Sequence, residues 1–164
     1  MITLILGGAG SGKSATAERL VAQLAAPVTF VATWVPDPTD RDMTARVAAH
    51  RERRPASWAV LECGRDLAAV VRTVTGTVLI DSLGTWVAGA DGDGTDVPAL
   101  CAALRERSGD TVIVSDEVGL GVHPSTEAGR QFRDALGLVN QAVAAVADRV
   151  WLVVAGRTLV VGEP

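Results

Sequence analysis

A lysine and a serine that follow a run of glycines are the residues best suited to chemistry near the start of the chain. Residues 7–14 read GGAGSGKS and match the phosphate-loop pattern G-x-x-x-x-G-K-[ST] at every fixed position. Glycines let the backbone close around a phosphate with its N–H groups pointing inward. Lys13 would reach the outer phosphates, and the Ser14 hydroxyl would ligate Mg²⁺. The predicted nucleoside triphosphate site therefore contains Gly7, Gly8, Ala9, Gly10, Ser11, Gly12, Lys13 and Ser14.

The segments around this motif have the order that a phosphate loop requires. Residues 2–6 are apolar and predict a short buried strand, and residues 15–24 predict a helix. This order would place a phosphate at the start of the helix, where the partial positive charge of the helix favours an anion. A glycine-rich turn without a ligand is the alternative to this interpretation.

Strands alternate with helices along the rest of the chain. Further strands are predicted over 28–33, 58–62, 77–81 and 111–115, and helices over about 41–55, 66–74, 97–107 and 126–146. Residues 89–96 are polar and glycine-rich and predict a surface loop. Residues 149–155 and 158–161 predict two strands joined by a Gly156-Arg157 turn, as an antiparallel hairpin at the sheet edge. The expected fold is α/β, a P-loop NTPase of RecA-like type: one domain over 1–164, with a mostly parallel sheet flanked by helices.

Composition excludes several classes of protein. The net charge of −4 argues against general nucleic-acid binding, which favours a broad basic surface. No apolar run approaches the roughly 18–20 residues of a membrane helix, and no basic leader precedes the first strand. Cys63 and Cys101 are the only cysteines and lack the spacing of metal ligands. We therefore expect a cytoplasmic protein without a membrane span or a nucleic-acid partner.

Carboxylates at strand ends are candidates for organising a metal ion. Asp81 ends the predicted strand 77–81, and in open α/β sheets ligands lie at the carboxyl ends of the strands. Asp81 is thus expected beside the phosphate loop as an acid that organises Mg²⁺, with a turn or helix-capping role as the alternative. Asp116 and Glu117 follow another predicted strand and could shape the substrate site, but their spacing does not require it.

His50 is the candidate nucleophile. It lies in a cluster of arginines at positions 46, 51, 53 and 54, an exception in an acidic protein and a candidate anion site. On a helix over residues 42–53, Met43, Val47 and His50 would share one face. An imidazole can attack phosphorus, and guanidinium groups can neutralise the oxygens around it. Spacing alone leaves open whether His50 is a nucleophile or a residue that is packed in the core or lies on the surface.

Several longer blocks of sequence carry a family resemblance. These blocks are GGAxSGKS at 7–14, VAT at 31–33, MxARVxxHRxxRPAxW at 43–58, EC at 62–63, DEVGxG at 116–121, FRD at 132–134, VNQ at 139–141 and ADxVWLVV at 147–154. Over nearly its whole length, the chain resembles the bifunctional adenosylcobinamide kinase / adenosylcobinamide-phosphate guanylyltransferase family of cobalamin biosynthesis. The phosphate loop alone is unspecific, and the middle and C-terminal blocks make the resemblance specific.

The resemblance implies two linked reactions. A nucleoside triphosphate (ATP or GTP) phosphorylates the aminopropanol hydroxyl of adenosylcobinamide, and GMP from GTP is then transferred to that phosphate through a guanylylated histidine. By position, that histidine is His50. Besides the phosphate loop, the implied nucleotide contacts are Ala32, Thr33, Trp34, Arg51, Glu52, Arg53, Arg54, Glu62 and Asp81. The implied cofactor is Mg²⁺, held by Ser14 and Asp81, and the implied assembly is a homotrimer with sites between subunits.

The chain departs from the family pattern at three positions. Many members have arginine where Gly10 stands, some have a second histidine at the position of Ala49, and the acid at Asp81 is often glutamate. The sequence does not identify the general base of the kinase step. It also leaves open whether the kinase step uses ATP or GTP. A plain P-loop metabolite kinase without a covalent intermediate is the alternative function, and a nucleotide-dependent regulatory module is a third.

Overall fold

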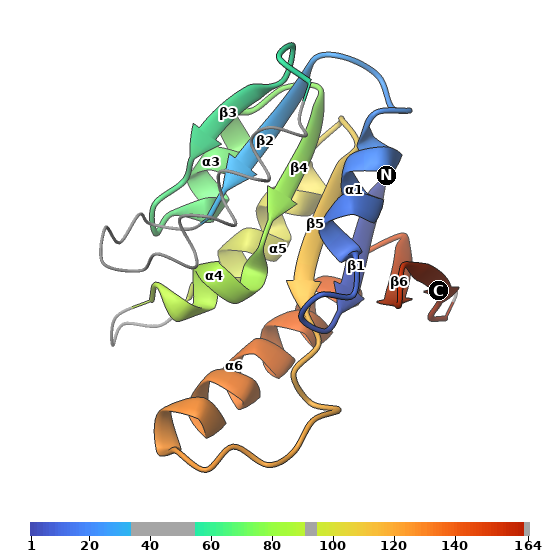
Figure 1. Ribbon diagram of the computed structural model, residues 1–164. Coiled ribbons are helices and arrows are strands. Elements are labelled where there is room, and N and C mark those ends of the chain that lie inside the picture. Colours follow the sequence, from blue (N-terminus) through green and yellow to red (C-terminus); the bar gives the residue numbers. More distant parts are fainter. Residues whose placement is uncertain (34–54, 91–94, 163–164) are drawn as a thin grey trace.

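One seven-stranded sheet organises the described residues. The computed structural model describes residues 1–33, 55–90 and 95–162 (Figure 1). The strands are β1 (Ile2–Gly7), β2 (Val28–Ala32), β3 (Ala59–Glu62), β4 (Thr77–Asp81), β5 (Thr111–Asp116), β6 (Arg149–Val154) and β7 (Arg157–Val160). Their order in the sheet is β3-β2-β4-β5-β1-β6-β7. The neighbouring strands run parallel from β3 to β6, and β7 pairs antiparallel with β6.

Four of the five helices in the described residues begin after a residue whose side chain caps them. They are α1 (Lys13–Val21), α3 (Leu67–Thr73), α4 (Leu83–Ala88), α5 (Val97–Glu106) and α6 (Glu127–Ala144). The side chains of Asp66, Ser82, Asp96 and Thr126 accept main-chain N–H groups at the starts of α3, α4, α5 and α6. Each cap satisfies one of the otherwise unpaired N–H groups of the first turn. In the part of the chain that the structure describes, no helix combines the length and apolarity needed to cross a bilayer.

Helices cover both faces of the sheet because its central strands are apolar on both sides. Val78 and Ile80 of β4 pack in one core cluster with residues of α3, α4, α5 and α6, and Leu79 packs in a second cluster with residues of α1. In Figure 1, α1 lies in front of the sheet and α3 and α5 lie behind it. Such continuous apolar strands are typical of a parallel sheet buried between two layers of helices.

The predicted fold is confirmed, with corrections at several element ends. Helix α1 spans 13–21 rather than 15–24, because its cap is Gly12 in the phosphate loop. The hairpin is present at the sheet edge, but its turn residues are Ala155 and Gly156, since Arg157 already pairs with Val154. Both turn residues have positive φ, 49° and 73°, as a type I′ turn requires.

Helix α4 was not predicted, and the helix expected over about 41–55 lies outside the described residues apart from Pro55. The six residues of α4 follow Ser82, whose hydroxyl forms a reciprocal capping box with Thr85. This short helix leads away from the carboxyl end of β4, so it forms part of the same sheet edge as the phosphate loop.

Candidate active site

The phosphate loop connects the carboxyl end of β1 with the start of α1. Gly12, the N-cap of α1, has φ 90° and no side chain to cap the helix, and the Ser11 hydroxyl accepts the Lys13 N–H group at 3.4 Å. A residue with a Cβ would be strained in this left-handed conformation, so glycine allows the sharp entry into the helix. The start of this nine-residue helix, whose N-cap is a glycine, can direct main-chain N–H groups at a bound phosphate.

Neighbouring segments hold the loop on two sides. The N–H group of Gly156, in the β6–β7 turn, donates to the Ser11 carbonyl at 2.8 Å. On the other side, the N–H group of Glu117 donates to the Gly7 carbonyl at 3.1 Å. The C-terminal hairpin and the end of β5 therefore both fix the backbone of the phosphate loop, which favours a preformed binding site.

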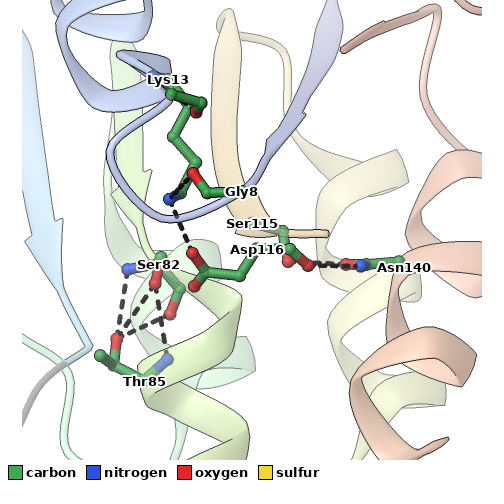
Figure 2. A network of polar contacts seen from close by, with 8 residues as sticks. Gly8, Lys13, Ser82, Thr85, Ser115, Asp116 and Asn140 are labelled. Carbon is green, nitrogen blue, oxygen red and sulfur yellow. Dashed lines mark hydrogen bonds and ion pairs between the residues drawn. The ribbon is translucent and has the colours of Figure 1, made fainter. Parts of the chain in front are cut away.

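Lys13 points from α1 across the loop towards the end of β5. Its Nζ atom lies 2.6 Å from Oδ1 of Asp116 and donates to the Gly8 carbonyl at 3.3 Å (Figure 2). The Lys13 side chain is 13% exposed and that of Asp116 is 30% exposed. The ammonium group is thus held by protein groups at the phosphate loop, next to the predicted position of the phosphates.

Asp116 occupies a fixed position at the carboxyl end of β5, beside the phosphate loop. It ends β5, and the register of the strands places it opposite Gly7. The Asn140 side chain on α6 donates to the Asp116 carbonyl at 3.1 Å and accepts from the Ser115 hydroxyl at 2.6 Å (Figure 2). A Cβ on Gly84 of α4 would overlap Oδ2 of Asp116, so glycine leaves room there for the carboxylate.

Asp81 lies at the same, carboxyl end of the sheet strands, one strand further from the phosphate loop than Asp116. It ends β4 and pairs with Val114 of β5 on one side and Ala32 of β2 on the other. Two strand spacings separate β4 from β1, which amounts to roughly 10 Å. Sequence reasoning placed Asp81 at the edge of the phosphate loop, and the strand order agrees.

Oxygen groups at this edge suit the predicted magnesium ion. Mg²⁺ prefers hard oxygen ligands, and usually binds one or two carboxylates together with substrate phosphates and waters. Ser14 supplies a hydroxyl in the first turn of α1, and the carboxylate of Asp81 ends β4 at the same end of the sheet. Within the described ranges, no three His, Cys, Asp or Glu side chains gather as a metal site by themselves. The donors that are present fit an ion that completes its shell with nucleotide and water.

Three further residues that are predicted to contact the nucleotide lie at the carboxyl ends of β2 and β3, away from the phosphate loop. Ala32 ends β2, Thr33 follows it, and Glu62 ends β3. Four strand spacings, roughly 19 Å, separate β3 from β1. The Thr33 hydroxyl donates to the Ser82 carbonyl at 2.6 Å and accepts the Ser82 N–H group at 2.9 Å. The Thr33 side chain therefore ties β2 to the start of α4, and any contact it makes with a nucleotide would come from its backbone.

Six predicted residues lie outside the described residues. They are Trp34, His50, Arg51, Glu52, Arg53 and Arg54. The candidate nucleophile and its arginine cluster therefore remain predictions from the sequence. Within the described ranges, the phosphate loop, Asp81, Ala32, Thr33 and Glu62 all lie at the carboxyl ends of parallel strands.

Asp116 is the site residue whose position the sequence did not reveal. Its signals were its place directly after a predicted apolar strand and its membership of the DEVGxG block at 116–121, and neither assigned it a role. Pairing of β5 with β1 brings it opposite the start of the phosphate loop, and no spacing along the chain expresses that pairing. Knowledge of the strand order would have identified it.

Cys63 follows Glu62 at the far end of the edge and is not suited to act as a nucleophile. Burial raises the pKa of its thiol to about 11, an effect that a main-chain hydrogen bond partly opposes and the charge of Asp66 reinforces. The reactive form of cysteine is the thiolate, which is scarce at neutral pH when the pKa is this high.

Comparison with known proteins identifies relatives over the whole chain. A sequence model of the family described as cobinamide kinase / cobinamide phosphate guanyltransferase matches residues 3–161. The bifunctional adenosylcobalamin biosynthesis protein CobP of Pseudomonas aeruginosa is 40% identical over 177 residues, covering 100% of this chain and 99% of that protein. The bifunctional adenosylcobalamin biosynthesis protein CobU of Salmonella typhimurium is 35% identical over 178 residues, covering 95% of this chain and 97% of that protein.

A solved structure shares only a distant likeness. The P4 protein of bacteriophage phi6, in complex with ADP, aligns with a TM-score of 0.47 and 16% identity, over 96% of this chain and 53% of that chain. The family match, by contrast, spans the phosphate loop and the C-terminal hairpin alike. This chain belongs to the cobinamide kinase / cobinamide phosphate guanyltransferase family.

Proposed function

We propose that this protein phosphorylates the aminopropanol hydroxyl of adenosylcobinamide and then transfers GMP from GTP to the new phosphate. The products of the second reaction are adenosylcobinamide-GDP and pyrophosphate. The observation that carries the proposal is the phosphate loop, with Lys13 held beside it by Asp116, in a chain that matches this family over residues 3–161. ATP and GTP are the candidate phosphate donors of the first reaction.

In the kinase step, the chain's task is to hold the triphosphate and favour departure of the nucleoside diphosphate. Main-chain N–H groups of the loop and the Lys13 ammonium would bind the β- and γ-phosphates. Ser14 and Asp81 would hold Mg²⁺, which neutralises the charge that develops on the phosphate oxygens. Positioning and electrostatic stabilisation supply most of the catalysis in such phosphoryl transfers.

In the transferase step, we propose that neutral His50 attacks the α-phosphorus of GTP. The N–P bond forms as the bond to pyrophosphate breaks, and the phosphate loop that binds the β- and γ-phosphates stabilises this leaving group. Arg51, Arg53 and Arg54 would stabilise the oxygens around the α-phosphorus. A phosphate oxygen of adenosylcobinamide phosphate then displaces His50 and takes the GMP.

The remaining predictions concern contacts and assembly. Trp34, Glu52, Glu62 and the backbone of Ala32 and Thr33 are proposed to contact the nucleotide. The proposed assembly is a homotrimer in the cytoplasm, in which the helix expected around His50 serves a site at a subunit boundary. Sedimentation of the native protein tests the trimer, and a monomer active at high dilution would contradict it.

Labelling with GTP tests the covalent step. GTP carrying radioactive phosphorus at the α-position should leave an acid-labile, base-stable adduct on the protein. Since the chain has only two histidines, His123→Ala is a matched control for His50→Ala. His123 is exposed and its Nδ1 atom lies 2.9 Å from Nη1 of Arg133. We expect His50→Ala to abolish the label and His123→Ala to retain it.

The same experiment separates the rival functions. Label that persists in His50→Ala would exclude His50 as the attacking group. A wild-type protein that phosphorylates adenosylcobinamide but takes up no label would favour the plain metabolite kinase. GTP binding without turnover of adenosylcobinamide would favour the regulatory module.

A further inference from the structure

We propose that Asp116 is the general base of the kinase step, accepting the proton of the adenosylcobinamide hydroxyl as it attacks the γ-phosphate. This inference rests on the proposed function, and it names a group that the sequence left open. Its starting point is the contact of 2.6 Å between Oδ1 of Asp116 and Nζ of Lys13.

The contact places the carboxylate beside the site of the terminal phosphate. The lysine of a phosphate loop reaches the β- and γ-phosphates of the bound nucleotide. A carboxylate that touches its Nζ atom therefore lies next to the phosphorus atom under attack. The Asp116 side chain is 30% exposed, so an incoming hydroxyl can reach it. A general base must lie within hydrogen-bond reach of the proton it removes, and this location satisfies that requirement.

The surroundings of Asp116 fix its position. Its carbonyl accepts from Asn140, which also accepts from the buried Ser115 hydroxyl, and the next N–H group in the chain donates to the Gly7 carbonyl. The carboxylate fills the space that Gly84 leaves open at the start of α4 (Figure 2 shows its contact with Lys13). The group is thus held by β5, α6 and the phosphate loop together, as a catalytic group requires.

The proton balance of the two reactions assigns Asp116 to only one of them. In the kinase step, the hydroxyl oxygen forms a bond to the γ-phosphorus, its proton passes to Asp116, and the nucleoside diphosphate departs with the electron pair of the broken P–O bond. In the transferase steps, the attacking atoms are a lone-pair nitrogen of neutral imidazole and an anionic phosphate oxygen. Neither attacking atom carries a proton that must be removed. The α-phosphorus also lies at the opposite end of the triphosphate from the γ-phosphorus.

A comparison of the two aspartates at opposite ends of β5 tests the inference. Asp116→Asn keeps the shape of the side chain and removes its basicity. Asp110→Asn is the matched control. Asp110 directly precedes the amino end of β5, far from the phosphate loop, and it also forms an ion pair, with its Oδ1 atom 3.1 Å from the N-terminal amino group. The kinase reaction is assayed with adenosylcobinamide and triphosphate, and the transferase reaction separately with adenosylcobinamide phosphate and GTP.

We expect Asp116→Asn to lower kcat of the kinase reaction by about 10²- to 10⁴-fold, the usual contribution of a general base. The KM for the triphosphate and the transferase rate should stay within a few-fold of wild type, and Asp110→Asn should change neither reaction. Gly84→Ala is a second variant, because its methyl group would push the carboxylate away while alanine favours the helix. It should also lower the kinase rate selectively.

Three results would overturn the inference. An equal fall in both reactions would mean that Asp116 acts by positioning Lys13, since both reactions use the triphosphate site. An unchanged kinase rate in Asp116→Asn, or a fall confined to KM, would also exclude it as the base. If the wild-type protein has no kinase activity, the proposed function itself fails, so the two failures can be told apart.

Discussion

The Asn140 side chain links helix α6 to the end of β5 in the active site. The loss of folding stability on removing this side chain can be estimated from its hydrogen bonds. Asn140 is 8% exposed and Ser115 is fully buried. Asn140→Ala would leave the Ser115 hydroxyl without its acceptor and the Asp116 carbonyl without its side-chain donor. A buried polar group left unpaired costs about 1–3 kcal/mol of stability. Because water can reach the Asp116 carbonyl more easily than the Ser115 hydroxyl, the Asp116 carbonyl should contribute the smaller part of the loss. We expect Asn140→Ala to lower the free energy of unfolding by about 3 kcal/mol.

A double-mutant cycle measures this coupling. Ser115→Ala alone leaves the Asn140 side-chain oxygen without its donor and should cost about 1–2 kcal/mol. Since the double variant removes both partners, its loss should be smaller than the sum of the single losses by about 1–2 kcal/mol. Urea unfolding followed by circular dichroism gives all three values.

The control is Leu138→Ala, which lies on the same helix but is 67% exposed. Its effect should stay within about 0.5 kcal/mol, as for most surface substitutions. Additivity of the Ser115 and Asn140 substitutions within about 0.3–0.5 kcal/mol would show that the two side chains do not interact, and would refute the account of how Asp116 is held.

Three further predictions concern single residues. Lys13→Ala should weaken binding of Mg-GTP about 10- to 150-fold in a calorimetric titration, because hydrogen bonds to charged groups contribute about 1.5–3 kcal/mol; unchanged affinity would contradict the site. Arg107→Ala should lower the free energy of unfolding by about 3 kcal/mol, since this guanidinium donates to three main-chain carbonyls of segment 71–76; a loss below about 0.5 kcal/mol in urea would contradict it. Because burial raises the pKa of Cys63 to about 11, a thiol reagent at pH 8 should label it far more slowly in the native protein than in urea, and equal rates would contradict its burial.

Local patterns in the sequence predicted most strands of the sheet and the phosphate loop of the site. The short apolar run Thr77–Asp81, bounded by turn residues, predicts a strand from local sequence, and the residues of the phosphate loop are contiguous. The hairpin was also predicted, although its turn shifted by one residue because Ala155 takes a positive φ. These features depend on contacts close along the chain, which is why the sequence expresses them.

The unpredicted features depend on contacts between distant segments. The six-residue helix α4 is too short to show a periodic pattern, and its start is held by the Thr33 hydroxyl, 49 positions away from Ser82. Asp116 meets Lys13 only because β5 is inserted between β4 and β1. Strand order follows from the packing of the whole sheet, so a reading of separate segments could not supply it.

The most direct test of the central claim is to follow adenosylcobinamide itself. The purified protein is mixed with adenosylcobinamide, Mg²⁺ and GTP, and the corrinoid products are separated over time by liquid chromatography and mass spectrometry. The account predicts that adenosylcobinamide phosphate forms first and is then converted to adenosylcobinamide-GDP with release of pyrophosphate, and that Lys13→Ala is severely impaired in both steps. Corrinoid that stays unmodified while the wild-type protein binds GTP would contradict it.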